Sequence, residues 1–354
     1  MQISHAEVTP VTMRLQKPIQ LANLPPIDQV TAIFLRLELT SGQSAWGCTV
    51  AHQDLTGDEP DKVLSVCLDA AEIVPDLHPT NIEYSLDQLI PLVADAPSAM
   101  CAFDLAFHDL LGLASGMPLY RLLGGYRNSI QTSATIPSGS VEESVSLAAA
   151  RAKSGFRMLK IKGGRDPDED VHRVRGIHRA FPNHILRLDP DGGYSVQAAI
   201  DVARALEGKI EMLEQPTPAD DLAGLCQVKE QSPVPILADQ SVRGPESALE
   251  IAAQHVSDGM SVKLASCGGL RCAGQIDAIA RAAKLATMVS CLVEPALLIA
   301  AGLSFALSSP NVHYADLDGY LELRDDPCLP DFQLQDGWLT ASEVPGLGCS
   351  VNLS

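Results

Sequence analysis

Two lysines stand two residues apart in the stretch RMLKIKGG, at the end of an apolar run. In a β-strand, residues i and i+2 point to the same face, so the ammonium groups of Lys160 and Lys162 would lie side by side. Like charges repel, and a lysine near a protein core is costly unless it has a partner. The pair therefore indicates either a solvent-exposed strand end or a site that uses both charges.

Three acidic residues and a further lysine lie at the ends of later apolar runs of strand length. Asp189 closes ILRLD, Glu214 closes IEMLE, Asp239 closes PILAD, and Lys263 lies in MSVKLAS. These four residues are separated by 25, 25 and 24 positions. Carboxylate oxygens suit Mg²⁺, whereas zinc would favour His or Cys, which do not occupy these positions.

The regular spacing reflects short apolar runs that alternate with amphipathic stretches from about residue 130 onward. Runs without polar alternation are typical of parallel strands buried on both faces, and VEESVSLAAARAKS and SVQAAIDVARALEG are amphipathic, as expected of helices. About eight strand-then-helix units predict an α/β fold, a (β/α) barrel of the TIM type, over residues 121–320. An open doubly wound sheet is the alternative, but no GxGxxG turn follows a first strand.

In such a barrel the carboxyl ends of the strands form the active-site face, where these charged residues would converge. A cation flanked by lysines favours removal of the α-proton of a carboxylate, because the cation neutralises the charge that develops. We expect Lys160 to lower the pKa of Lys162 toward neutrality, so that Lys162 can act as a base. Lys263 would face the other side of the substrate carbon, and two opposed bases allow inversion.

Residues 1–120 have a different pattern. VTAIFLRLELTSGQSAWG predicts two strands around a Ser-Gly turn, and SAMCAFDLAFHDLLGLASG predicts a helix that Gly116 ends. We therefore expect an α+β capping domain ahead of the barrel. The tail, residues 321–354, is too short to be a domain and would complete the capping domain.

The composition excludes several classes of protein. The net charge of −19 argues against nucleic acid or an anionic membrane as a partner, and no apolar run is long enough to cross a bilayer. The nine cysteines are scattered without a CxxC pair, which favours a reducing cytoplasmic location over a disulfide framework.

The motifs, taken in order, resemble the enolase superfamily, in its muconate lactonizing enzyme and mandelate racemase branch, over nearly the whole chain. The match comprises the KxK of Lys160 and Lys162, the LD, EQP and PILAD segments, and KLxxCGGL beginning at Lys263. The resemblance implies one Mg²⁺ ion on the three carboxylates and a homo-oligomer. It also implies that cap loops at residues 18–28 and 48–58 set the specificity.

The segment ADLDG narrows the resemblance. A DxD at the end of strand eight, here Asp316 and Asp318, resembles the dipeptide epimerases, in which two aspartates hold the N-terminal ammonium of the substrate. This implies a dipeptide substrate whose C-terminal carboxylate lies on the metal and whose C-terminal α-proton the two opposed lysines exchange. Lys160 would hold a substrate oxygen, and Thr135 would line the pocket. The alternative for the two aspartates is a solvated turn.

Two positions bear on the substrate side chain. Leu24 stands where alanine-glutamate epimerases carry an arginine, and Val293 stands where some relatives carry an aspartate for cationic substrates. With Cys291 as a further lining residue, the pocket would be apolar and would reject an unpaired charge. We therefore expect an apolar or aromatic C-terminal residue in the substrate.

Three residues depart from the family pattern. Gln240 replaces the usual Glu, Asp191 replaces the usual Asn, and Ser266 replaces a second lysine. None of these changes removes a ligand or a base. The alternatives are another α-proton abstraction on the same scaffold (N-acylamino acid racemisation, cycloisomerisation or dehydration) or a barrel that binds a ligand without turnover. The DxD discriminates among the enzymes, because an N-acylated substrate has no ammonium.

Overall fold

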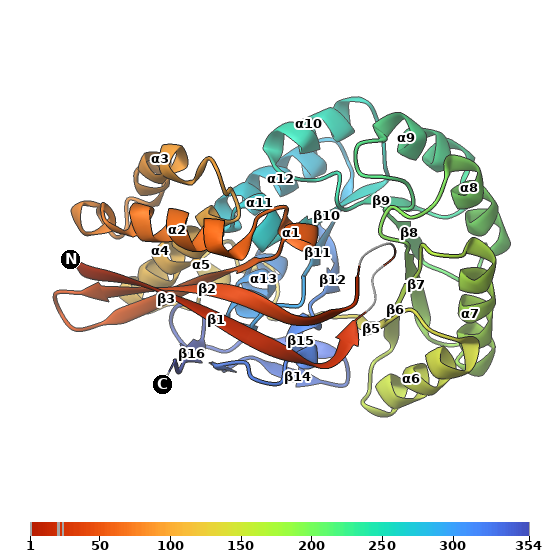
Figure 1. Cartoon of the computed structure of the whole chain (residues 1–354), viewed down its shortest axis with the longest axis horizontal. Coiled ribbons are helices and arrows are strands. Elements are labelled where there is room, and N and C mark those ends of the chain that lie inside the picture. The colour runs from red at the N-terminus through yellow and green to blue at the C-terminus, as the bar shows by residue number, and fades with distance from the viewer. Residues whose placement is uncertain (1, 20–21, 23–24, 354) are drawn as a thin grey trace.

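The N-terminal part of the chain is a three-stranded antiparallel sheet, at the lower left of Figure 1. The computed structural model describes residues 2–19, 22 and 25–353. The two strands expected around a Ser-Gly turn are present, and Gly42 has the positive φ of 84° that favours glycine in this turn. The sheet has the order β1 (Ile3–Ile19), β2 (Ile27–Leu39) and β3 (Ser44–Ala51).

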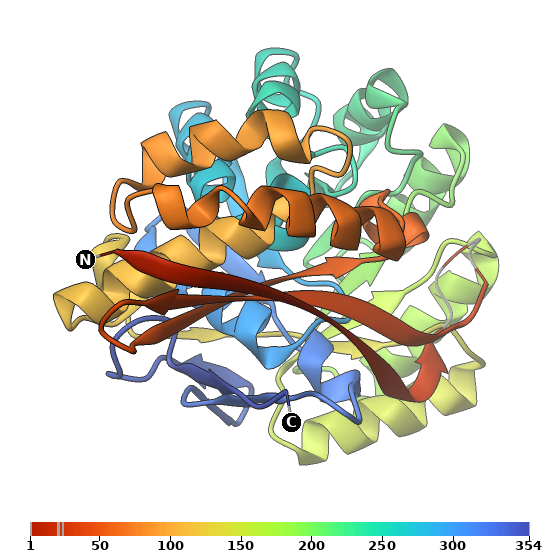
Figure 2. The same cartoon turned by 60° about the vertical axis from the view of Figure 1, so that its left-hand side comes forward.

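Helices cover one face of this sheet, as Figure 2 shows. The longest of them, α4, packs closely on β3. Glycine at position 47 permits this approach, because a Cβ there would come within 1.9 Å of the carbonyl oxygen of Ala102. It ends at Gly116, as predicted, in the left-handed conformation. The elements of this region are α1 (Gln53–Thr56), α2 (Pro60–Ala71), η1 (Val74–Asp76), α3 (Ile82–Val93), α4 (Ala99–Ser115) and α5 (Leu119–Leu122).

Eight parallel strands form the nearly closed barrel that the sequence predicts, and neighbouring strands follow one another in the chain. The last strand returns toward the first, where the backbone N–H of Ser133 donates to the carbonyl of Ala315 at 3.2 Å. The strands are β5 (Ala134–Ile136), β6 (Met158–Lys162), β7 (Ile185–Asp189), β8 (Met212–Glu214), β9 (Ile236–Ala238), β10 (Gly259–Lys263), β11 (Ala286–Ser290) and β12 (Val312–Asp316).

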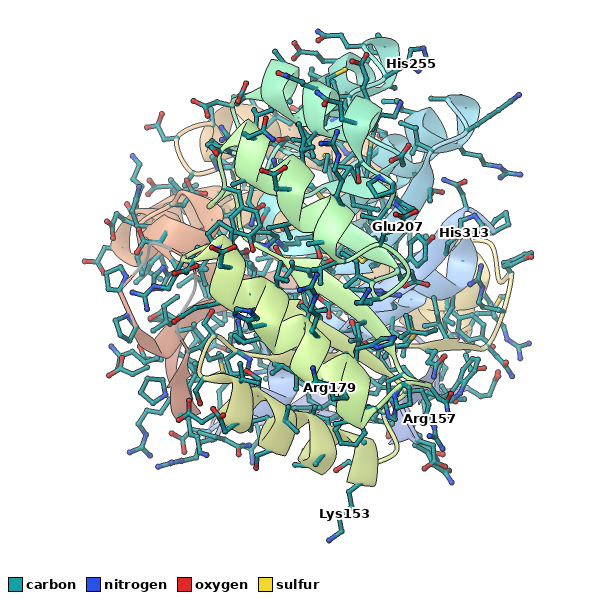
Figure 3. The ribbon with its side chains drawn as sticks, turned by 90° about the vertical axis from the view of Figure 1, so that its right-hand side faces the viewer. Lys153, Arg157, Arg179, Glu207, His255 and His313 are labelled. Atoms are coloured by element: carbon teal, nitrogen blue, oxygen red, sulfur yellow. The ribbon has the colours of Figure 1, made fainter. Side chains whose placement is uncertain are left out.

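Amphipathic helices surround the barrel and present polar side chains outward; Figure 3 shows Lys153, Arg179 and Glu207 at this outer surface. The first begins at a capping box of Ser140 and Glu143. Within the described ranges, no helix is both long and apolar enough to cross a membrane. The helices are α6 (Val141–Lys153), α7 (Pro167–Ala180), α8 (Val196–Ala205), α9 (Leu222–Gln231), α10 (Pro245–Ala253), α11 (Leu264–Cys267) and α12 (Leu270–Ala282).

The C-terminal tail contacts both parts of the molecule. The run SIQTSATI, predicted as one strand, is divided: its first half, β4, pairs with the tail strand β15, and only its second half joins the barrel. On the cap side, the N–H of Arg324 donates to the carbonyl of Arg14 at 2.9 Å. The division of the chain at residues 120 and 321 stays a prediction. The elements are β4 (Ser129–Gln131), η2 (Gly319–Glu322), β13 (Cys328–Pro330), β14 (Gln333–Gln335), β15 (Trp338–Thr340) and β16 (Cys349–Val351).

Two buried aspartates of α4 join the cap to the other parts of the chain. Asp104 accepts hydrogen bonds from the N–H groups of Leu270 (2.7 Å) and Arg271 (3.1 Å), and so caps the N-terminus of α12. Asp109 accepts from one N–H of β3 (3.0 Å) and one N–H of the tail (2.7 Å). Burial nevertheless raises the pKa of Asp109 to about 6.

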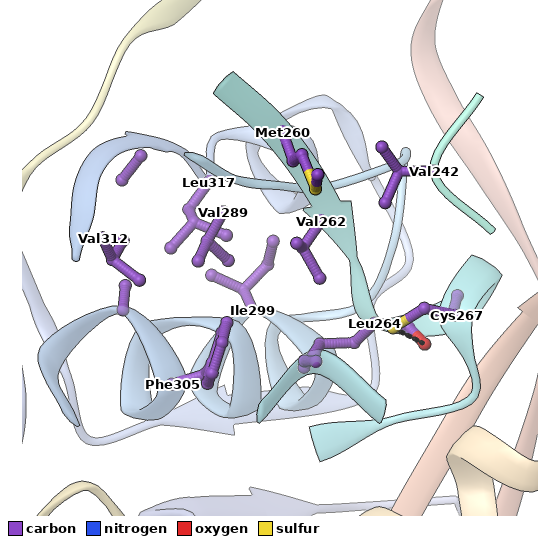
Figure 4. Close-up of a cluster of buried hydrophobic side chains, with 14 of the residues drawn as sticks. Val242, Met260, Val262, Leu264, Cys267, Val289, Ile299, Phe305, Val312 and Leu317 are labelled. Atoms are coloured by element: carbon purple, nitrogen blue, oxygen red, sulfur yellow. Dashed lines mark hydrogen bonds between the residues drawn. The ribbon is translucent and has the colours of Figure 1, made fainter. Parts of the chain in front are cut away.

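One helix connects the cores of the barrel and the cap. All residues of α13 (Ala296–Ser308) are buried, because it packs against β11 on one side and against β3, β13 and β16 on others. Figure 4 shows Ile299 and Phe305 of this helix beside Val289 and Val312 of the barrel. The apolar core is therefore continuous from the barrel into the cap.

Candidate active site

A cavity of about 270 Å³ lies at the carboxyl ends of the barrel strands. Its lining includes Lys160, Lys162 and Lys263 from the barrel, and Ile27 and Leu55 from the cap. The charged residues that the sequence places at successive strand ends therefore do converge on one face. The three predicted metal ligands are buried beside the lysines.

The carboxylates of Asp189, Glu214 and Asp239 form a compact group, with one oxygen from each within 4.8 Å of the others. Among the described residues, neither oxygen of Glu214 receives a hydrogen bond of good geometry, although the Lys160 Nζ lies 2.9 Å from one of them. Buried carboxylate oxygens without donors, in an all-oxygen set, are what a hard divalent cation requires. The residues present therefore fit Mg²⁺.

The electrostatics of this group are uneven. Burial would raise the pKa of Asp189, but Lys160 and Lys162 hold it well below its usual value. For Glu214, burial and then the neighbouring Asp189 raise the pKa to about 8. The crowded carboxylates thus repel one another, and added positive charge among them would relieve that repulsion.

Lys160 is surrounded by carboxylates. Its Nζ lies 2.7 Å from Asp316, 2.9 Å from Asp189 and 2.9 Å from Glu214, and the side chain is only 2% exposed. Burial would lower the pKa of Lys160, but these carboxylates raise it well above its usual value. Lys160 is therefore a fixed positive charge rather than a proton carrier.

Lys162 and Lys263 lie on strands from opposite sides of the barrel, since β6 is the second and β10 the sixth of the eight strands. Lys160 acts to lower the pKa of Lys162, as expected, but the net pKa does not fall toward neutrality in this arrangement. Burial and Lys160 do act to lower it, but Asp189 (2.7 Å) and Asp191 (2.9 Å) outweigh them, and the pKa is raised. The Nζ of Lys263 forms an ion pair with Asp239, which also raises its pKa against the effect of burial.

Asp316 and Asp318 are both buried, so they do not belong to a solvated turn. Asp316 accepts from Lys160 (2.7 Å) and from the hydroxyl of Ser133 (2.6 Å). Asp318 accepts from the N–H (2.6 Å) and the hydroxyl (3.2 Å) of Thr135. Burial and then Asp316 raise the pKa of Asp318 to about 7, so this edge of the cavity holds more negative charge than its neighbours balance.

The remaining wall of the cavity is mostly apolar. Cys291 and Val293 follow β11 and line it, as predicted, whereas Leu24 lies outside the described residues. The Sγ of Cys291 accepts from the N–H of Gly319 at 3.3 Å, and burial raises the pKa of this thiol well above its usual value. Cys291 is therefore a packing residue of the wall, not a nucleophile.

Sequence reasoning missed one charged pair at the cavity. Glu322 lines the cavity and forms an ion pair with Arg151 of α6, 171 positions away in the chain. No local pattern marks either residue. Of the three departures from the family pattern, Asp191 and Gln240 line the cavity, whereas Ser266 lies on α11 and is not among the lining residues.

Comparisons with known proteins identify the family of this chain. Residues 143–354 match the model of the enolase C-terminal domain-like family. The L-Ala-D/L-Glu epimerase of Bacillus subtilis (strain 168) is 32% identical over 98% of this chain and 96% of that protein. The hydrophobic dipeptide epimerase of Enterococcus faecalis (strain ATCC 700802 / V583) is 31% identical over 99% of this chain and 100% of that protein.

A solved structure extends the likeness to three dimensions. The dipeptide epimerase from Enterococcus faecalis V583, complexed with Mg and the dipeptide L-Leu-L-Tyr, superposes with a TM-score of 0.95. It is 30% identical in sequence and covers 99% of this chain and 100% of its own. The similar proteins are isomerases, and the chain belongs to the enolase C-terminal domain-like family, the mandelate racemase and muconate lactonizing enzyme group.

Proposed function

We propose that this isomerase is a Mg²⁺-dependent epimerase of L,L-dipeptides that inverts the α-carbon of the C-terminal residue. The observation that carries the proposal is the placement of Lys162 and Lys263 on opposite sides of the barrel. The three carboxylates of Asp189, Glu214 and Asp239 lie between them. Relatives named as dipeptide epimerases, at about 30% identity over nearly the whole chain, support it.

The aspartate pair would hold the N-terminal ammonium of the dipeptide. Asp316 already accepts from Lys160 and Ser133, whereas Asp318 has, within the described part of the chain, only the two donors of Thr135. Burial and then the neighbouring Asp316 raise the pKa of Asp318, and an ammonium group would offset both effects. This requirement favours a free dipeptide over an N-acylamino acid, which carries no ammonium.

The buried carboxylates of Asp189, Glu214 and Asp239 would hold one Mg²⁺ ion. When bound, this ion supplies positive charge that stabilises the negative charge developing on the substrate carboxylate. Lys160 adds a second, permanent positive charge, because three carboxylates keep its ammonium protonated and in place. A carboxylate oxygen of the substrate would therefore face Lys160.

The two remaining lysines would exchange the α-proton. One lysine, in its neutral form, removes the proton from one face of the C-terminal α-carbon, and the ammonium of the other returns a proton to the opposite face. The same pair serves the reverse reaction with the roles exchanged. Both side chains are mostly buried, at 13% exposed for Lys162 and 11% for Lys263, so the returning proton comes from the lysine ammonium, which exchanges with solvent between turnovers.

The apolar wall would receive the side chain of the C-terminal residue. Ile27 and Leu55 of the cap and Leu292 and Val293 of the barrel line the cavity. A charged side chain would lose its hydration against these four residues and gain no partner from them, although the carboxylates of Asp54 and Glu322 also line the cavity. We therefore propose a preference for apolar or aromatic C-terminal residues.

The experiment is a mass-spectrometric screen of L,L-dipeptides in D₂O with Mg²⁺. We expect one deuteron in dipeptides with an apolar C-terminal residue, together with formation of the L,D isomer, and no inversion by Lys162→Ala or Lys263→Ala. Chelation of the metal should stop the reaction. Exchange into N-acylamino acids or hydroxy acids, with none into any dipeptide, would overturn the assignment of the substrate.

A further inference from the structure

Two residues of the cavity wall connect the surroundings of the catalytic lysines. The Nε2 of Gln240 donates to the Oδ1 of Asp191 at 3.1 Å, and Asp191 in turn lies 2.9 Å and 3.1 Å from the Nζ of Lys162. Gln240 directly follows Asp239, whose carboxylate pairs with Lys263. Polar contacts therefore run from Lys162 through Asp191 to Gln240, and the backbone connects Gln240 to the residue that pairs with Lys263.

The backbone holds Asp191 in this place. Its φ is +49°, a left-handed conformation that few residues other than Gly, Asn and Asp adopt, and its N–H donates to the Oδ1 of Asp189 at 3.1 Å. The carboxylate is 12% exposed and reaches Lys162 beside Asp189. Lys162 thus has two carboxylate partners, one of which is a predicted metal ligand and one of which is not.

The orientation of Gln240 follows from that of Asp191. An ionised carboxylate only accepts hydrogen bonds, so the amide nitrogen of Gln240 must face it. This leaves the Oε1 of Gln240 buried, with no hydrogen-bond donor among the described residues. The negative charge of the pair therefore lies on the Lys162 side, and only a neutral amide lies next to Asp239.

We propose that Asp191 and Gln240 act as one positioning unit, in which Asp191 holds the ammonium of Lys162 and Gln240 holds Asp191. When Asp189 binds a cation, Asp191 remains as the partner that keeps Lys162 in line with the α-carbon. The pair carries one carboxylate and one amide in contact, and exchanging the two residues would leave its net charge unchanged. This inference rests on the proposed role of Lys162 as a base.

The test compares Asp191→Asn, Gln240→Glu and the double variant with the parent protein. Asp191→Asn removes the carboxylate that holds Lys162, and Gln240→Glu places two carboxylates in contact, so each single change should lower kcat about tenfold to a hundredfold. The double variant restores the contact between one carboxylate and one amide but leaves no carboxylate at residue 191 to hold Lys162, so its kcat should stay as low as that of Asp191→Asn. Ser266→Ala, outside the cavity lining, is the matched control and should leave kcat unchanged.

A second readout is the Tm of the four metal-free proteins, which needs neither substrate nor turnover. Both single variants should have a lower Tm than the parent, and the double variant should recover. Additive effects on Tm would overturn the contact between the two residues, and recovery of kcat in the double variant would overturn the role of the Asp191 carboxylate in holding Lys162. A parent protein that exchanges no deuterium into dipeptides would refute the proposed function, while recovery of Tm would still support the contact.

Discussion

Buried carboxylates serve opposite purposes in the cap and at the barrel mouth. Asp104 and Asp109 of α4 each accept two backbone N–H groups from another segment of the chain. Burial alone raises the pKa of Asp109 to about 6, whereas burial together with neighbouring carboxylates raises the pKa of Glu214 to about 8 and that of Asp318 to about 7. The first pair is satisfied by the fold itself, whereas the second pair lacks positive charge that a cation and an ammonium would supply. Stability and function thus use the same side chain in different electrostatic surroundings.

The sharpest test of this comparison is Glu214→Gln. We expect proton exchange to fall by about a thousandfold or more, because a ligand that holds the charge-stabilising ion is lost. The metal-free protein should gain stability, because a neutral amide that can donate to Asp189 or Asp239 replaces a crowded carboxylate. Kinetics with Mg²⁺ and thermal unfolding without it measure the two effects. Retained activity, or a lower Tm, would contradict the assignment of Glu214.

Asp109, one of the two cap aspartates that the fold provides with donors, can be tested through the pH dependence of the free energy of unfolding. Its pKa is about 6 in the folded chain and about 3.8 when exposed, so protonation favours the folded state. The contribution of Asp109 is therefore largest below pH 4 and declines as pH rises to about 6, by roughly 3 kcal/mol at most. The free energy of unfolding of the parent minus that of Asp109→Asn, measured from pH 4 to 7, isolates this change. A difference in the free energy of unfolding that grows as the pH rises would contradict this prediction.

Asp318→Asn tests the second carboxylate that lacks positive charge, at the edge of the cavity where the substrate ammonium would bind. The amide keeps the shape of the side chain but loses the charge that attracts an ammonium group. We expect kcat/KM for dipeptides to fall by roughly tenfold to a hundredfold, about 1.5–3 kcal/mol for a hydrogen bond to a charged group. Dipeptides and N-acetylated dipeptides should be compared on both proteins. Equal losses on the two substrates would argue against an ammonium at Asp318.

The smallest effect is expected for Asp104→Ala. It removes the cap of α12, which should cost about 1–2 kcal/mol of stability. The catalytic lysines keep their own contacts, so kcat at low temperature should change little. Urea unfolding and kinetics of the same preparation separate the two quantities. A large loss of kcat with unchanged stability would place Asp104 in the catalytic machinery instead.

The barrel and its charged face could be predicted because each strand carries its own information. Asp189, Glu214 and Lys263 each end a short, mostly apolar run of strand length, and their regular spacing corresponds to one strand and one helix. Convergence then follows from parallel strands, whose carboxyl ends share one face. Helix α4 of the cap was predictable for the same reason, because its own sequence carries the helical pattern and the glycine, Gly116, that ends it.

Features that depend on distant segments could not be predicted. The pKa of Lys162 rises rather than falls because Asp189 and Asp191, on another strand and its loop, outweigh Lys160. SIQTSATI looks like one strand, but the tail strand β15 pairs with its first half. Glu322 reaches the cavity through a tail whose local sequence shows no periodic pattern. In each case, a segment distant in the chain decides the pKa, the strand pairing or the lining of the cavity.

The buried helix α13 has a consequence for synthesis on the ribosome. Strand β3 is made about 250 residues before α13, yet the two pack against each other in the finished core. At about 5–20 residues per second, the cap strands wait roughly ten to fifty seconds for this partner to emerge. We expect the nascent cap to depend on chaperones during this interval, which arrested nascent chains ending before and after α13 would reveal by their protease resistance.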